Sequence, residues 1–137
     1  MRPAITTVIA CLLALSACAH AGAWRHGDGV ALPRTPAAGE RVSLEVELGV
    51  IGSGQEVVLR APDGRLIGTV SPHGIRPGNA AGTYVVPVPD DALASSLEHG
   101  RLHLRFVIER AGAATRPATA EEVRNVRAVI IGNDPPR

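Results

Sequence analysis

The alternation of apolar and polar residues in "RVSLEVELGV", residues 41–50, constrains the fold of this chain more than any other feature. Every second residue from Val42 to Val50 is apolar, and polar residues or glycine occupy the positions between. Side chains of a β-strand point alternately to opposite faces of the sheet, so this period of two predicts a strand with one buried face. The segment therefore predicts a β-sheet protein.

Further segments carry strand and turn signals. The Asp63-Gly64 pair lies between "EVVLR" and "RLIGTV", which predicts a β-hairpin. Residues 101–109, "RLHLRFVIE", alternate again and predict a second long strand. Residues 83–89, "TYVVPVP", predict an edge strand, because their two prolines cannot donate hydrogen bonds to a neighbouring strand. "VRAVIIG", residues 126–132, predicts a closing strand.

One segment has a helical pattern. In "DDALASSLEHG", residues 90–100, Asp90 or Asp91 can cap the start, two leucines four residues apart share a face, and Gly100 can end the helix. Short strands separated by frequent turn signals are typical of all-β architectures. We expect a small antiparallel β-sandwich of six or seven strands with one short crossing helix, and a small open barrel as the alternative.

The N-terminus has the pattern of an export signal. Arg2 precedes an apolar run over residues 4–17, which is shorter than the ~20 residues of a membrane-spanning helix and is typical of a secretory signal peptide. The run ends in Leu15-Ser16-Ala17-Cys18, "LSAC", which resembles the lipobox of bacterial lipoproteins. The resemblance implies that Cys18 is diacylated and becomes the mature N-terminus. Ordinary cleavage after Ala21 and retention of the run as a core helix are the alternatives.

The resemblance also implies a location and a domain plan. Ala19 follows the cysteine where an inner-membrane retention signal would have aspartate, so in a Gram-negative host we expect anchoring in the outer membrane, facing the periplasm. Trp24 either sits at the membrane interface or packs on the edge of the domain. We expect a signal peptide at 1–17, the lipidated cysteine and a flexible tether at 18–40, a β-sandwich at 41–132 and a disordered tail at 133–137.

Composition restricts the possible partners and reactions. All 14 basic residues are arginine, they are interspersed with 13 acidic residues, and no basic block predicts a nucleic-acid partner. The absence of lysine excludes Schiff-base chemistry on a lysine side chain. Ser71 and His73 lie close in sequence, but no carboxylate is identified to orient the histidine, and the segment is typical of a loop. We therefore expect no catalytic residues and no enzymatic activity.

The histidines do not form a metal-binding motif. His99 and His103 lie four residues apart, but on a loop and a strand rather than on one helical face. His20 and His26 lie in the predicted tether, where a weak surface copper or zinc site is conceivable. The chain has no HExxH motif and no cysteine–histidine cluster. We therefore expect no specific metal site and no cofactor.

A row of cationic side chains is the candidate for a partner contact. Arg101, His103 and Arg105 alternate along the strand predicted at 101–109, which would place all three on its outward face. Such a stripe suits a carboxylate-rich partner, anionic lipid or an acidic glycan. The alternative is that these residues pair with the outward Glu45 and Glu47.

A second resemblance concerns the mature domain. "LIGTVSPHG", "GTYVVPVPDDAL" and "LHLRFVIE", within residues 66–109, resemble the β-rich C-terminal module of tyrosinase-type oxidases. That resemblance implies a similar sandwich and a docking role. Together these features predict a lipid-anchored envelope protein that binds the membrane through its anchor and an unidentified envelope protein or polymer, without catalysis. The alternative is an accessory or metal-handling module for an exported enzyme such as a copper oxidase.

Overall fold

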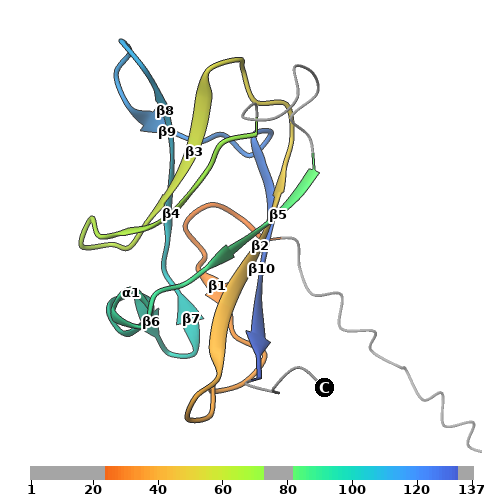
Figure 1. Ribbon diagram of the computed structural model, residues 1–137, viewed down its shortest axis with the longest axis vertical. Helices are drawn as coiled ribbons and strands as arrows, with labels where there is room; N and C mark the ends of the chain where they lie inside the picture. The colour runs from red at the N-terminus through yellow and green to blue at the C-terminus, as the bar shows by residue number, and fades with distance from the viewer. Residues whose placement is uncertain (1–23, 73–81, 133–137) are drawn as a thin grey trace, which may run out of the picture.

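The computed structural model describes residues 24–72 and 82–132, which form a β-sandwich with one short helix (Figure 1). The predicted signal peptide, Cys18, His73 and the tail at 133–137 lie outside the described residues. The predicted all-β class is confirmed. The described residues contain ten strands in three antiparallel sheets, more than the six or seven expected, because four of the ten strands have only two residues each.

The first large sheet has the strand order β10-β2-β5. Its central strand is β2 (Arg41–Leu48), flanked by β10 (Val123–Ile131) and by β5 (Gly82–Pro87) as the edge strand that its prolines predicted. The predicted alternation is confirmed from Val42 to Leu48, because this apolar face of β2 is buried in the core, but it is wrong for Val50, which lies beyond the strand and is 68% exposed. The four residues of the buried face, each at most 1% exposed, are Val42, Leu44, Val46 and Leu48.

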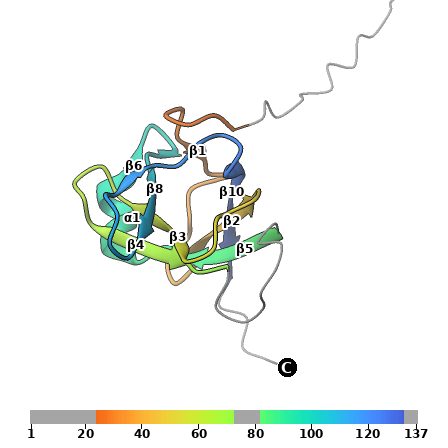
Figure 2. The ribbon, with the colours of Figure 1, turned by 90° about the horizontal axis from the view of Figure 1, so that it is seen from above.

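The second large sheet, in the order β4-β3-β8-β9, faces the first across the core (Figure 2). It contains β3 (Gln55–Arg60), β4 (Leu66–Val70), β8 (Arg105–Arg110) and β9 (Arg116–Pro117). The hairpin predicted at Asp63-Gly64 joins β3 to β4. The core residues that this sheet contributes include Val57, Leu59, Phe106 and Ile108.

The edge strands β4 and β5 approach one another closely where the two large sheets meet. A Cβ atom on Gly68 of β4 would lie 2.5 Å from the Cγ1 atom of Val86 in β5. Because that distance is far below van der Waals contact, the absence of a side chain at residue 68 is what lets the sheets approach here.

The opposite side of the sandwich is closed by a small sheet in the order β1-β7-β6. Strand β1 (Val30–Ala31) pairs with β7 (Arg101–Leu102), which pairs in turn with β6 (Leu97–Glu98). Val30 is only 3% exposed, and Trp24 packs partly buried against the core. The prediction of a flexible tether is therefore wrong for residues 24–32, in which Trp24, Val30 and Leu32 pack against the core. A two-residue strand is too short to show a period in the sequence.

The helix and the segment after it differ from the prediction. Helix α1 (Asp90–Ser96) begins after Pro89 without a side-chain cap, so neither aspartate caps it. The chain leaves the helix at Ser96, and two residues with positive φ, His99 (51°) and Gly100 (73°), form the turn between β6 and β7. Gly100 thus closes a hairpin rather than ending the helix. No helix in the described part of the chain is long and apolar enough to span a membrane.

Two loops that lead into the paired strands β2 and β10 are closed by the same arrangement. Glu40 accepts hydrogen bonds from both terminal nitrogens of Arg34, at 2.5 and 2.7 Å, and from the backbone N–H three residues earlier at 2.6 Å. Glu122 likewise accepts hydrogen bonds from both terminal nitrogens of Arg116, at 2.9 and 2.5 Å, and from the backbone N–H of Thr119 at 2.9 Å. Because these bonds favour the ionised carboxylate, Arg34 lowers the pKa of Glu40 to about 2, and Arg116 lowers the pKa of Glu122.

Candidate functional site

The predicted cationic stripe does not exist as one row, because residues 101–109 do not form one strand. Arg101 belongs to β7 of the small sheet and Arg105 to β8 of a large sheet, and the chain crosses between these sheets at His103 and Leu104. The tight turn at His99-Gly100 pairs β7 with β6, so the first two residues of the predicted strand, Arg101 and Leu102, belong to the small sheet, whereas β8 pairs with β3.

The three residues of the stripe have separate surroundings. The Arg101 Nε donates a 3.0 Å hydrogen bond to the backbone oxygen of Asp28. The His103 Nε2 lies 3.9 Å from a carboxylate oxygen of Glu98. Arg105 lies opposite Arg60 in the register of β3 and β8. The alternative pairing with Glu45 and Glu47 is also wrong, because the Glu45 carboxylate accepts its hydrogen bonds from Arg127, and among the described residues no ion pair joins Glu47 to any of the three.

Arg101 instead contributes to an open groove of about 870 Å³ beside strands β1 and β10. The groove brings together residues that are far apart in the sequence: the segment before β1, the strands β1, β2 and β10, and the start of β7. Its polar lining consists mainly of guanidinium and carboxylate groups. The charged residues are Arg25, Asp28, Glu47, Arg101, Arg124 and Arg127, and Trp24 forms part of the wall.

A β-bulge places Arg124 in this groove. Val123 pairs with Leu48 and Asn125 with Glu47, so Arg124 is the extra residue in β10. The bulge exposes Arg124 and Asn125 in succession, where a regular strand would turn one of them inward. The spacing of the buried residues in β10 records the same shift, with two residues between Val123 and the next buried valine but only one thereafter.

Most of the groove's arginines retain an unneutralised charge. Arg127 pairs with Glu45, but Arg25, Arg101 and Arg124 form no ion pair with any carboxylate among the residues that the structure describes. The Arg101 hydrogen bond goes to a backbone oxygen, which leaves its positive charge available. Guanidinium groups bind phosphate and carboxylate oxygens with paired N–H donors, so the chemistry of the groove is that of an anion-binding surface.

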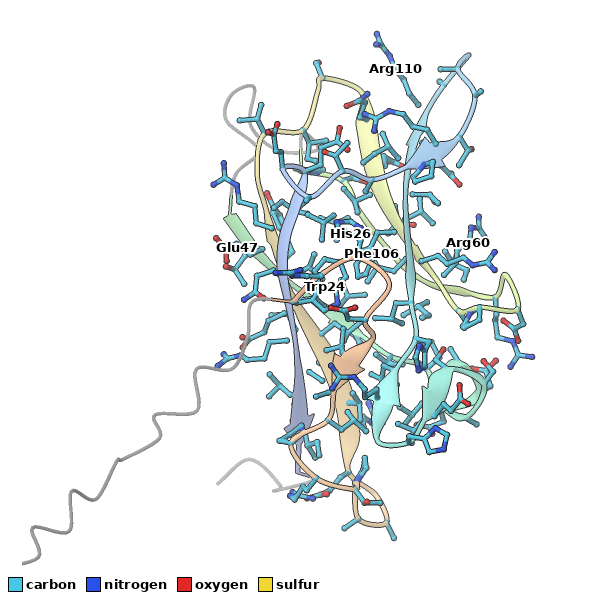
Figure 3. The ribbon with its side chains drawn as sticks, turned by 180° about the vertical axis from the view of Figure 1, so that it is seen from behind. Trp24, His26, Glu47, Arg60, Phe106 and Arg110 are labelled. Carbon is cyan, nitrogen blue, oxygen red and sulfur yellow. The ribbon has the colours of Figure 1, made fainter. Side chains whose placement is uncertain are left out.

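Trp24, which forms part of the groove wall, belongs to an aromatic cluster with His26 and Phe106 (Figure 3). The ring centroids of Trp24 and Phe106 lie 5.2 Å apart in an edge-to-face arrangement, and those of Trp24 and His26 lie 4.6 Å apart. The His26 Nε2 lies 3.3 Å from the carbonyl oxygen of Val123, at the start of β10. The cluster fixes the N-terminal segment over the end of the core. Trp24 therefore packs on the domain, which was one of the two placements predicted for it.

The described residues contain no group of three or more histidine, cysteine, aspartate or glutamate side chains arranged to hold a metal ion. His99 and His103 both lie within 4 Å of the Glu98 carboxylate, in and beside the β6–β7 hairpin. Ser71 donates a 2.7 Å hydrogen bond to Glu56, and its suggested partner His73 lies outside the described residues. The metal-handling alternative stays a prediction.

The sequence pointed to three residues of the groove, Trp24, Glu47 and Arg101, but not to their sharing one surface, and it missed the rest. The irregular spacing of apolar residues after Val123 was the only signal that could have indicated the bulge at Arg124. Arg25 was hidden in a segment without periodicity. No protein-family model, no curated protein and no solved structure matches the chain, and the resemblance of residues 66–109 to an oxidase module stays a prediction.

Proposed function

We propose that this chain is a lipid-anchored protein of the bacterial cell envelope, acylated at Cys18, whose β-sandwich binds an anionic envelope component and catalyses no reaction. The observation that carries the proposal is the "LSAC" motif directly after the apolar run at 4–17. In a Gram-negative host the absence of aspartate after Cys18 favours the outer membrane, with the domain facing the periplasm.

The position of the folded domain suits this arrangement. The described core is built from residues between Val30 and Ala128, all of which follow the proposed acylation site. Removal of residues 1–17 would also remove Cys11, so the mature chain would have no second thiol for a disulfide. Its stability in an oxidising compartment then depends on packing, which the fully buried leucines and valines of the sandwich supply.

The binding role is supported by the groove beside β1 and β10. Three arginines without a carboxylate partner in the described residues, Arg25, Arg101 and Arg124, come from three separate parts of the chain and line one open depression. Such a surface recognises phosphate or carboxylate groups by charge and by paired hydrogen bonds.

Metabolic labelling with radioactive palmitate tests the anchor. We expect the wild-type chain and Cys11→Ser to incorporate label and to partition with membranes, and Cys18→Ser to do neither. Cys11→Ser is the matched control, because it removes the other cysteine of the same N-terminal segment. Labelling that survives Cys18→Ser would refute the proposal, as would recovery of the unprocessed chain from the cytosol.

A further inference from the structure

The arginine-lined groove opens beside the part of the domain that lies nearest in sequence to the proposed anchor. Trp24 and Arg25 line the groove and are the first residues that the structure describes. Five residues separate Cys18 from Trp24 in sequence, so the connection of six residue steps spans at most about 22 Å whatever its conformation. If Cys18 is held in a bilayer, this wall of the groove cannot be farther than that from the anchored residue.

The charges on this surface match what it would meet there. Arg25, Arg101 and Arg124 have no carboxylate partner among the described residues, and two carboxylates, Asp28 and Glu47, share the groove with them. The excess is therefore cationic. Electrostatic attraction to an anionic surface decays over about 8–10 Å at ionic strengths near physiological. The connection from Cys18 to Trp24 is long enough for the groove to come this close to the bilayer surface.

We propose that this groove docks onto anionic phospholipid headgroups of the membrane in which the protein is anchored, so that the sandwich lies on the bilayer with the β1–β10 side facing the lipid. The orientation rests on the proposed acylation, whereas the lipid preference belongs to the folded surface. Trp24 forms part of the wall of this groove, although its indole N–H is buried in the domain.

The chain from residue 18 onward offers a direct test, because Cys18 is then its only thiol and Trp24 its only tryptophan. Coupling Cys18 to a maleimide-bearing lipid anchors the protein at the proposed position without the bacterial acylation machinery. The vesicles contain phosphatidylcholine alone or with added phosphatidylglycerol, and a lipid with a nitroxide on its headgroup quenches Trp24 when the groove faces the bilayer.

We expect strong quenching on phosphatidylglycerol vesicles, weak quenching on phosphatidylcholine, and loss of the difference at high salt. A basic residue near an anionic surface favours the docked state about fivefold. The double variant Arg25→Glu/Arg124→Glu should therefore lower the docked-to-undocked ratio by about 25-fold or more. The matched control is Arg105→Glu/Arg110→Glu, which makes the same change in charge on β8, and Arg110 projects well away from Trp24 (Figure 3).

Each outcome bears on the proposal. Quenching that depends on phosphatidylglycerol, is lost in the groove variant and persists in the control supports it. Equal quenching on both kinds of vesicle, or a groove variant that behaves like the wild type, overturns it. Quenching of the wild type that does not weaken at high salt also overturns it, without any substitution. Failure of palmitate labelling at Cys18 would instead refute the anchor and leave the measured lipid preference of the groove unchanged.

Discussion

Gly49 occupies a position where the close approach of two backbone segments leaves no room for a side chain. Its N–H donates a 2.9 Å hydrogen bond to the backbone oxygen of Glu122, and a Cβ atom at residue 49 would lie 2.0 Å from the backbone oxygen of Glu121. The φ of Gly49 lies outside the left-handed region, so alanine could adopt its backbone conformation. The substitution Gly49→Ala therefore tests the close approach of the backbones at residues 49 and 121, together with a 2.8 Å approach of the added Cβ to the Arg124 Nε.

The expected cost follows from how far the two segments must separate. A carbon–oxygen contact needs about 3.3 Å, so the loop must move by about 1.3 Å. That loop is held by the paired hydrogen bonds between Arg116 and Glu122, which resist the movement. Overpacking of this kind costs about 1–3 kcal/mol, and loss of the Gly49 hydrogen bond about 1 kcal/mol more. We expect Gly49→Ala to lower the free energy of unfolding by about 2–4 kcal/mol.

Urea and thermal unfolding of the mature chain measure this cost. For a domain of this size the loss corresponds to a fall in Tm of roughly 10–20 °C. Gly132→Ala is the matched control, because a Cβ atom there meets nothing within 4 Å, and we expect a change below about 0.5 kcal/mol. A Gly49→Ala protein as stable as the Gly132→Ala protein would show that the backbones at residues 49 and 121 leave room for a side chain.

Three further predictions concern other contacts of the sandwich. Gly68→Ala should lower the free energy of unfolding by about 1–3 kcal/mol, because its methyl group would clash with Val86. In a double-mutant cycle Val86→Ala should relieve part of this loss, and additive effects would contradict the close approach of β4 and β5. The free energy of unfolding should fall as the pH drops from 4.5 towards 2, because the folded chain holds the pKa of Glu40 near 2 and the unfolded chain binds more protons in that window. In the variant Glu40→Gln/Glu122→Gln the free energy of unfolding should depend less on pH over this range, and an unchanged dependence would exclude these carboxylates as its cause. His99→Asn should raise the free energy of unfolding by a few tenths to about 1 kcal/mol in urea, because asparagine tolerates positive φ in a two-residue turn before glycine; a loss of stability would indicate that the histidine side chain contributes more than the turn costs.

Local patterns in the sequence predicted the elements whose structure depends on near neighbours. The alternation over 41–50 was sufficient for β2, because burial of one face imposes a period of two on the strand itself. The hairpin at Asp63-Gly64 and the edge position of β5 followed in the same way, from turn residues and from prolines that cannot pair on both sides. These features supported the all-β class without knowledge of any distant contact.

The groove depends on contacts that no local pattern contains. Its residues come from the segment before β1 and from β2, β7 and β10, which meet only once the strands have paired. The apparent strand at 101–109 shows the same limit, since its apolar alternation is largely preserved while the chain passes from one sheet to another at His103. Periodicity reports which side chains are buried, and it does not report which strand lies alongside.

The sequence by itself determined that this chain is a β-sheet protein, and it predicts an export signal with an acylation site at Cys18, because alternation, turn residues and the lipobox-like motif are all read within a few residues. Only the tertiary structure decided that residues 24–32 pack on the domain and that Arg25, Arg101 and Arg124 share one surface. The physical reason is that strand pairing and the bulge in β10 are chosen by the energy of the whole packed core, to which residues far apart in the chain contribute together.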